Sequence, residues 1–233
     1  MADVSVVIPA LDEADLCVAR LDALQGLRTQ GAELVLVDGG SRDATPELAR
    51  ARVDRLLASP PGRARQMNAG ARQASGEVLW FLHLDSQVPP GAVAQLRQAA
   101  VAGPGWGRFD VRLDGRAPLL RVVERMMNLR SRLTGIVTGD QGLFVRRALF
   151  EQVGGFPEIA LMEDIAISGR LRRLARPACL RPPLVTSARR WERDGIVRTI
   201  LLMWLLRAAY RLGADPARLA RIYYPCDTPP RAS

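Results

Sequence analysis

Four short strand-like segments alternate with helix-like segments in the first third of the chain, and no other feature limits the possible folds as strongly. The strand-like segments span residues 4–8, 34–37, 53–58 and 78–84. The first two are apolar runs, which are typical of strands that are buried on both faces. Residues 12–30 and 62–75, which lie between them, have the spacing of helices. Strands separated by helices predict an α/β fold with a mostly parallel sheet and right-handed crossovers.

The pattern changes after Gly103-Pro104-Gly105. Residues 106–113 alternate between apolar and polar side chains and predict an antiparallel strand, and a further strand is expected at residues 143–145. Helices are expected at residues 118–133, 165–174 and 192–212. The prolines within residues 177–183 are expected to interrupt regular structure. The C-terminal part is therefore predicted to be mainly helical.

Composition excludes several classes of protein. The 233 residues, 48% of them hydrophobic, suffice for one large folded domain or two small ones and exclude intrinsic disorder. The longest apolar run, residues 200–206, is far shorter than the ~20 residues that span a bilayer. A strand that starts at Val4 leaves no room for a secretory leader, so a cytoplasmic location is expected. The scattered Cys17, Cys179 and Cys226 indicate reduced thiols, and neither disulfides nor a zinc site.

The basic residues are all arginine and are concentrated near the C-terminus. Residues 1–169 carry 19 arginines and 20 acidic residues, a net charge of −1. Residues 170–233 carry 14 arginines and 4 acidic residues, a net charge of +10. Such an excess suits a nucleic acid, an anionic membrane surface or a polyphosphate leaving group as partner. A P-loop nucleotide site is excluded because it requires a lysine.

Acidic residues follow three of the predicted strands directly: Asp12 and Glu13 after the first, Asp38 after the second and Asp85 after the fourth. The carboxyl ends of parallel strands meet at one edge of a sheet, where open α/β proteins bind ligands. Carboxylates gathered there suit hydrogen bonds to a nucleoside and the ligation of Mg²⁺ or Mn²⁺. A dinucleotide-dependent dehydrogenase is excluded, because the first strand-to-helix turn contains no glycine.

Six ordered blocks make the sequence similar to a known family. The blocks are SVVIPALDEA, VLVDGGSRDAT, GRARQMNAGA, VLWFLHLDS, GDQGLFVRRALFEQVGGFP and MEDIAISGRL. Together they cover about residues 4–175 and resemble the family 2 glycosyltransferases of the GT-A fold. Three of them, GRARQMNAGA, LHLDS and GDQG, are most similar to small single-domain bacterial members, some of which act on carotenoids or other lipids.

The resemblance implies a nucleotide site and a metal site. The residues that would contact the nucleotide are Pro9, Asp12, Glu13, Asp38, Arg63, Arg65 and Asn68. The family's D-x-D motif, which binds the divalent metal on the donor diphosphate, corresponds here to His83 and Asp85. The resemblance thus implies Mn²⁺ or Mg²⁺ as cofactor. An imidazole at the first position suits Mn²⁺ better than Mg²⁺.

The resemblance also implies catalytic and acceptor residues. Asp164 would be the general base that deprotonates the acceptor, and Glu163 would orient it or the acceptor. Asp140 and Gln141 lie in the block that faces the donor sugar and the acceptor in this family. The residues Arg189, Arg190 and Trp191 resemble an arginine–tryptophan motif near the acceptor of related synthases, although the glutamine of that motif is missing.

These observations predict an inverting glycosyltransferase that moves a sugar from a nucleoside diphosphate to a hydroxyl or carboxyl group, with lipids and carotenoids as candidate acceptors. Residues 1–175 would form the catalytic GT-A domain, and residues 176–233 a basic helical extension packed on it. An anionic membrane surface is a candidate partner, with the protein peripheral on the inner face of the cell membrane. A GT-A-like nucleotidyltransferase and a basic nucleic-acid-binding protein are the alternatives, although no nucleic-acid partner is expected. The oligomeric state stays open.

Overall fold

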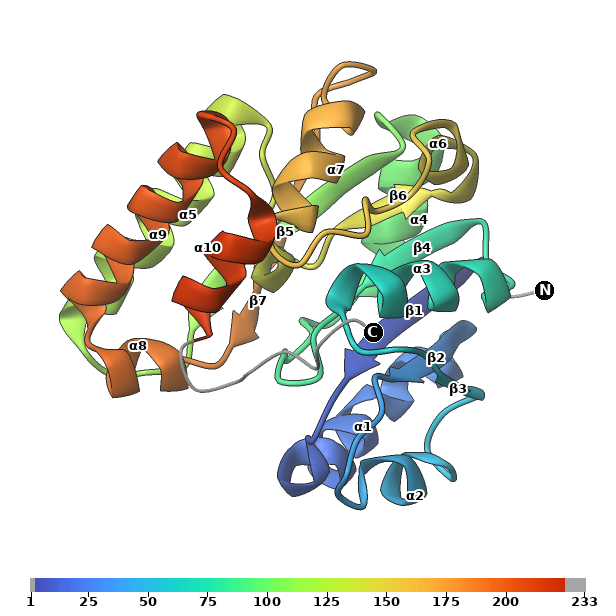
Figure 1. Cartoon of the computed structure of the whole chain (residues 1–233). Helices are drawn as coiled ribbons and strands as arrows, with labels where there is room; N and C mark the ends of the chain where they lie inside the picture. Colours follow the sequence, from blue (N-terminus) through green and yellow to red (C-terminus); the bar gives the residue numbers. More distant parts are fainter. Residues whose placement is uncertain (1–2, 225–233) are drawn as a thin grey trace.

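A seven-stranded mixed sheet forms the centre of the computed structural model, which describes residues 3–224 (Figure 1). The strand order is β3-β2-β1-β4-β6-β5-β7. The strands are β1 (Val4–Ala10), β2 (Ala32–Asp38), β3 (Arg55–Ala58), β4 (Val78–Phe81), β5 (Trp106–Leu113), β6 (Phe144–Arg146) and β7 (Ala178–Thr186). Strands β1 to β4 pair in parallel, as the alternation of strands and helices predicts; β1, β2 and β4 are buried, whereas β3, at the edge, is partly exposed.

Helices cover both faces of the sheet. They are α1 (Ala14–Thr29), α2 (Thr45–Ala49), α3 (Arg63–Gln73), α4 (Ala92–Ala102), α5 (Pro118–Thr134), α6 (Arg147–Gln152), α7 (Glu163–Leu171), α8 (Arg189–Asp194), α9 (Ile196–Arg211) and α10 (Pro216–Tyr223), with a 3₁₀ turn at Gly139–Gln141. One core lies between the sheet and α1, α2 and α4, and the other lies between the sheet and α3, α6 and α7. Successive residues of β1 divide between them: Val6 and Ile8 face the first core, and Val7 faces the second.

The predicted strand at residues 106–113 is β5, and it has one antiparallel and one parallel neighbour in the sheet. It runs antiparallel to β6, where Trp106 lies opposite Val145, and parallel to β7. The α/β prediction and the mostly parallel sheet are therefore confirmed.

The expected break at residues 177–183 is wrong, because these residues belong largely to β7. β7 is an edge strand of the sheet, and an edge strand tolerates prolines because its outer side does not continue the ladder. On that outer side Val185 forms an isolated bridge with Gln87, away from the two prolines. The pairing with β5 is irregular between Phe109 and Val111, opposite Pro182 and Pro183. The sheet thus continues past residue 175 into the segment predicted as a helical extension.

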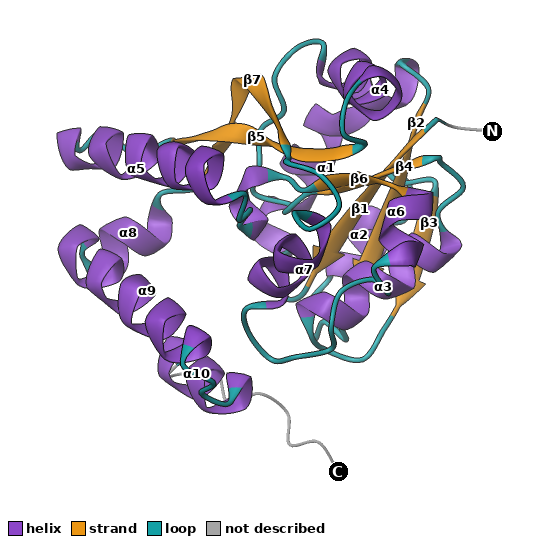
Figure 2. Cartoon of the chain, turned by 90° about the horizontal axis from the view of Figure 1, so that it is seen from above, coloured by secondary structure: helices purple, strands orange, loops and turns teal. Residues whose placement is uncertain are grey.

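The single helix expected at residues 192–212 is also wrong. Gly195 has a φ of 85° and separates α8 from α9. In Figure 2, α8 lies at one end of a V whose two sides are α5 and α9. Helix α10 packs back on α9 through Leu206 and Leu219. The C-terminal helices therefore project beyond the sheet instead of lying flat on it.

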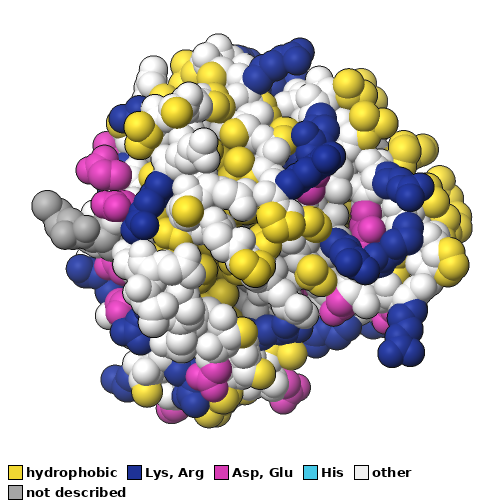
Figure 3. Space-filling view, turned by 180° about the vertical axis from the view of Figure 1, so that it is seen from behind, with side chains coloured by type: hydrophobic (Ala, Val, Ile, Leu, Met, Phe, Trp, Pro, Cys, Tyr) yellow, Lys and Arg dark blue, Asp and Glu magenta, His cyan; other side chains and the backbone are white. Residues whose placement is uncertain are grey.

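The surface mixes charged and apolar side chains. On the face seen in Figure 3, arginines are interspersed with hydrophobic side chains and carboxylates. Within residues 3–224 no helix combines the length and the apolar character that crossing a bilayer requires. Cys17 and Cys179 are free thiols, and Cys226 lies outside the described residues.

Candidate active site

A cavity of about 1210 Å³ opens at the carboxyl ends of the central strands. The sheet side contributes residues that follow β1 and β4 and the ends of β5 and β7, and α7 contributes its first turn. Helices α5, α8 and α9 form the opposite walls, on the side where Figure 2 shows the V. The cavity therefore lies where parallel α/β sheets bind their ligands.

Ten of the residues predicted for the site line this one cavity. They are Glu13, Arg63, His83, Asp85, Asp140, Glu163, Asp164, Arg189, Arg190 and Trp191. They come from segments up to 178 residues apart in the sequence, from Glu13 to Trp191. The strand ends and the later blocks thus converge.

The carboxylates at the strand ends are held in a partly buried, mutually repulsive arrangement. Burial raises the pKa of Asp85, which Arg63 opposes and the charge of Asp140 reinforces. Burial also raises the pKa of Glu13, and the charge of Asp85 adds to it. Burial, followed by the positive charge of Arg63, lowers the pKa of His83 to about 3. His83 is therefore neutral at physiological pH.

These residues fit a divalent metal that is shared with a diphosphate. Oδ1 of Asp85 is buried and has no hydrogen-bond partner within residues 3–224, and the neutral imidazole of His83 is two residues away. No group of three acidic, histidine or cysteine side chains in that part of the chain could hold a metal alone. Mg²⁺ and similar ions are commonly bound by one or two carboxylates together with substrate phosphates and water. Asp85 and His83 would supply the protein's share of such a site.

Asp164 is positioned by two backbone N–H groups. It lies in the first turn of α7, after Met162, whose φ of 72° is unusual for a residue with a side chain. Gly139 N donates to Asp164 Oδ2 over 3.0 Å, and Ile165 N donates to Oδ1 over 2.7 Å. Each carboxylate oxygen keeps a lone pair that can accept a further proton.

The adjacent Glu163 and Asp164 repel each other in a buried setting. Burial raises the pKa of Glu163, and the negative charge of Asp164 raises it further, while Arg63 opposes both effects. Burial also raises the pKa of Asp164, against the two backbone hydrogen bonds and the charge of Arg207. A carboxylate with a raised pKa is a stronger base, which suits proton abstraction.

Several predicted nucleotide residues have structural partners outside the cavity lining. Asp38 accepts hydrogen bonds from the backbone N–H groups of Gly40 and Ser41 and so shapes the turn after β2. Asn68 donates to Phe156 O over 2.8 Å and accepts from Phe156 N over 3.0 Å. Both functional groups of the Asn68 amide are thus engaged with the backbone of one residue.

The other residues at the first turn lie nearer the surface. Asp12 accepts from the backbone of Arg42 over 2.7 Å and joins the loops after β1 and β2. Arg65 is exposed and lies 3.4 Å from Glu158. Pro9 is half-buried within β1 and is not part of the cavity lining.

Some of the residues predicted to contact the acceptor also have structural partners. Gln141 is fully buried and accepts hydrogen bonds from Thr138 N and Oγ1, which closes a capping box. The guanidinium of Arg190 lies 3.5 Å from the centre of the Tyr223 ring and donates to Tyr223 O over 2.7 Å. Arg190 therefore fastens α10 to α8. Trp191 packs against the apolar cluster beneath α5.

Sequence reasoning missed three arginines in the cavity: Arg130 of α5, Arg193 of α8 and Arg207 of α9. The C-terminal half of the chain carries many arginines, and no signal in the sequence separates these three from the others. The large apolar share of the lining was missed too: it includes Met126, Ile200 and Trp204.

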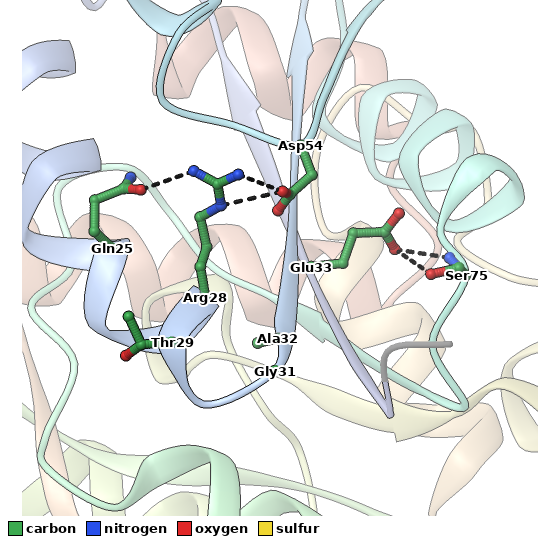
Figure 4. A pocket seen from close by; sticks show the side chains of 8 residues that line it. All are labelled: Gln25, Arg28, Thr29, Gly31, Ala32, Glu33, Asp54 and Ser75. Atoms are coloured by element: carbon green, nitrogen blue, oxygen red, sulfur yellow. Dashed lines mark hydrogen bonds and ion pairs between the residues drawn. The ribbon is translucent and has the colours of Figure 1, made fainter.

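A second, open depression lies at the opposite edge of the sheet, near the start of β2 (Figure 4). Its charged groups already have partners: Arg28 pairs with Asp54 over 2.6 Å, and Glu33 accepts hydrogen bonds from Ser75. Within residues 3–224, the charged side chains of this depression are therefore engaged with one another or with neighbouring residues.

The fold is shared with solved glycosyltransferases. S. aureus TarS (residues 1–349) superposes with a TM-score of 0.64 at 19% identity, covering 81% of this chain and 61% of that one. The mannosyltransferase PcManGT from Pyrobaculum calidifontis, in complex with GDP-Man and Mn²⁺, superposes with a TM-score of 0.62 at 23% identity. That match covers 95% of this chain and 68% of PcManGT. Both confirm the predicted GT-A architecture.

The sequence is also similar to that of known glycosyltransferases. An undecaprenyl-phosphate 4-deoxy-4-formamido-L-arabinose transferase of Yersinia enterocolitica is 33% identical over 157 residues, which are 61% of this chain and 47% of that protein. The chain thus matches about half the length of this relative. The family described as Glycosyl transferase family 2 matches residues 5–153. The predicted resemblance is confirmed, and the chain belongs to glycosyl transferase family 2, whose members are glycosyltransferases.

Proposed function

We propose that the protein transfers a sugar, with inversion, from a nucleoside diphosphate to an amphiphilic acceptor. One observation carries the proposal. Gly139 packs against His83 of the proposed metal site and donates a hydrogen bond to Asp164, the proposed base. The proposed site for the leaving diphosphate and the proposed base therefore both contact Gly139, and both line the same cavity.

The donor would bind at the strand ends. Glu13 and Arg63 line the cavity beside Asp85 and would contact the nucleotide, while Asp85 and His83 would hold the metal. A divalent ion, when bound, neutralises charge on the diphosphate. Arg63 and Arg189 would stabilise the same developing charge, since both act electrostatically on Asp85. The solved relative PcManGT was crystallised with GDP-Man and Mn²⁺, which supports this class of donor and cofactor.

The chemistry requires one displacement. The Asp164 carboxylate accepts the proton of the acceptor hydroxyl as its oxygen forms a bond to the anomeric carbon. The bond between that carbon and the diphosphate oxygen breaks, and its electron pair leaves with the diphosphate. Attack opposite the leaving group inverts the configuration. Glu163, buried beside Asp164, would orient the base by its charge and shape.

The acceptor side of the cavity is apolar. Val122 and Met126 of α5 face the space that Met203 and Trp204 of α9 line from the other side. The name of the Yersinia relative refers to undecaprenyl phosphate, which supports a lipid-like acceptor here. Exposed apolar residues on α9, with the basic C-terminal segment, support peripheral contact with an anionic membrane from the cytoplasmic side.

A thermal-shift screen of the whole chain against nucleotide sugars, with Mn²⁺ and with Mg²⁺, tests the proposal. We expect at least one nucleoside diphosphate sugar to raise the unfolding temperature in a metal-dependent way, since a bound ligand stabilises the folded state. A nucleotidyltransferase would be stabilised by nucleoside triphosphates instead, and a nucleic-acid-binding protein by oligonucleotides. Either of these results without a response to nucleotide sugars would contradict the proposal.

A further inference from the structure

The part of the cavity between α5 and α9 contains a cation that the proposed donor site does not use. Arg130 extends from α5 into the cavity. Its Nε and Nη1 atoms are buried and have no hydrogen-bond partner among residues 3–224. In that part of the chain Nη2 alone has a hydrogen-bond partner, Thr138 Oγ1, at the long distance of 3.4 Å. Buried donors are nearly always paired, so a guanidinium with two unpaired donors indicates a missing ligand or ordered water.

A second arginine faces the same place from the other wall. Arg207 of α9 lines the cavity, and its charge acts on both Arg130 and Asp164. Burial, followed by the repulsion of Arg207, lowers the pKa of Arg130 to about 10. The carboxylates of Asp140 and Asp164 raise this pKa, but they do not offset burial and repulsion together. Two like charges held together in a buried site are costly without a counterion.

Other arginines of the protein show what a structural role looks like. Arg132 of α5 and Arg181 of β7 both pair with Asp110, at 2.6 and 2.8 Å. Arg190 stacks on Tyr223. These side chains join elements of the fold and have partners that satisfy their donors. Arg130 lacks such a partner within the described chain, so packing alone does not account for it.

The site around Arg130 adjoins the proposed base. Nη2 of Arg130 contacts Oγ1 of Thr138, and the next residue, Gly139, donates its N–H to Asp164. The charges of Asp140 and Asp164 also act on Arg130. Arg130 therefore belongs to the Asp164 side of the cavity, where the acceptor would enter.

We propose that Arg130 and Arg207 form a subsite for a phosphate group of the acceptor, whose apolar chain lies between α5 and α9. Guanidinium groups are planar forks that suit phosphate oxygens, and hydrogen bonds to charged groups gain strength where water is excluded. Met126, Met203 and Trp204 would contact the chain. The assignment rests on the proposed function and names the class of its acceptor: an amphiphile that carries a phosphate and presents a hydroxyl to Asp164.

Calorimetry on the full chain tests the subsite with three probes: octyl phosphate, octyl glucoside and inorganic phosphate, each below any critical micelle concentration. We expect octyl phosphate to bind more tightly than the other two. Arg130→Gln and Arg207→Gln should each weaken octyl phosphate about 10- to 100-fold, the range for a hydrogen bond to a charged group. Octyl glucoside, which has the chain without the charge, should change by less than about twofold.

Matched controls are available on the same helices. Arg125 of α5 and Arg198 of α9 are exposed and lie outside the cavity lining, so Arg125→Gln and Arg198→Gln should bind octyl phosphate like the wild type. Trp204→Ala should weaken octyl phosphate and leave inorganic phosphate unchanged. Arg130→Gln should unfold at a temperature equal to or above that of the wild type, because it removes one of two buried like charges.

Equal loss of octyl phosphate binding in the control variants would overturn the subsite, because it would show a general effect of surface charge. Unchanged binding in folded Arg130→Gln and Arg207→Gln would overturn it as well. Equal affinity for inorganic phosphate and octyl phosphate would overturn the amphiphilic ligand and identify a soluble phosphate instead. UDP and GDP with Mn²⁺, titrated into the same proteins, test the proposed function separately. If the wild type binds neither diphosphate, the proposed function is contradicted. The titrations with octyl phosphate, octyl glucoside and inorganic phosphate test the subsite alone.

Discussion

Gly139 N donates a hydrogen bond of 3.0 Å to Asp164 Oδ2, and the same glycine leaves no room for a side chain next to His83. A Cβ atom at position 139 would lie 2.9 Å from both Cε1 and Nε2 of the imidazole. The proposed base and the proposed metal ligand therefore depend on the position of one backbone segment.

Gly139→Ala should lower turnover by displacing either His83 or the N–H that holds Asp164. A misplacement of about 1 Å near reacting groups can cost roughly 10²-fold in rate. Steady-state transfer measurements on the folded variant check this. Gly169→Ala in α7 is the matched control, because a Cβ there meets nothing within 4 Å and alanine favours a helix. Full activity of Gly139→Ala would contradict the link between His83 and Asp164.

Asp164→Asn should reduce turnover by about 10²–10⁴-fold, the usual contribution of a general base, and leave donor affinity nearly unchanged. The amide keeps the size of the side chain but does not accept a proton at working pH. Glu163→Gln should cost less if Glu163 orients the base. Transfer rates and donor dissociation constants, measured separately, check the prediction. Near wild-type turnover of Asp164→Asn, or equal losses in turnover and donor affinity, would contradict the role of the base.

Glu163→Gln should also change how stability depends on pH. The raised pKa of Glu163 means that the folded protein holds its proton more tightly than the unfolded chain does. The free energy of unfolding therefore falls as the pH rises from 4.5, the ordinary pKa of a glutamate, through the raised pKa of Glu163 in the folded protein. Glutamine removes this penalty, so the variant should gain about 1.4 kcal/mol for each unit of the shift at higher pH.

Urea unfolding of Glu163→Gln and the wild type at about pH 4 and about pH 8 measures the difference. The variant should gain stability at the higher pH and little at the lower one. A gain that is larger at about pH 4 would show that the carboxylate of Glu163 is stabilised, not destabilised, in the folded protein.

Anionic vesicles should bind the protein at low salt through α9. Leu201 and Leu205 of this helix are 59% and 64% exposed. Arginines lie both before and after the helix in the sequence. Replacing both leucines by glutamate should abolish flotation with the vesicles, and raising salt from about 0.05 to 0.5 M should weaken it through screening. Leu174→Glu, at an exposed leucine after α7, is the control. Equal flotation of both variants would exclude α9 as the contact.

The parts of the fold that local pattern determines could be predicted from the sequence. β1 and β2 are buried on both faces, so their apolar runs identified them directly. β7 could not be predicted in this way, because its two prolines are acceptable only on an edge strand, and edge position is a property of the assembled sheet. Gly195 likewise ends a helix that the apolar spacing alone would continue.

Site residues that directly follow strands could be predicted from the sequence. Site residues on helices could not, because their place in the cavity depends on how the helices pack against one another. Asp85 and Glu13 end strands whose direction already places them at one edge. Arg130 differs from exposed Arg125 only in the side of α5 that it occupies, and the position of α9 opposite that side is a tertiary fact. Asn68 shows the converse: it belongs to a family block, yet its amide is engaged by Phe156.

The most direct test of glycosyl transfer in this cavity is calorimetric titration of UDP, GDP and dTDP, each with Mn²⁺, into the wild type and Asp85→Asn. Asp85 has a buried oxygen without a partner in the described chain, so its loss should remove the protein's main contact to the metal and the diphosphate. Asp22→Asn, on the exposed side of α1, is the matched control. We predict that at least one diphosphate binds the wild type and Asp22→Asn in a Mn²⁺-dependent manner and binds Asp85→Asn at least about tenfold more weakly. Equal binding by all three proteins, or none by the wild type, would contradict the account.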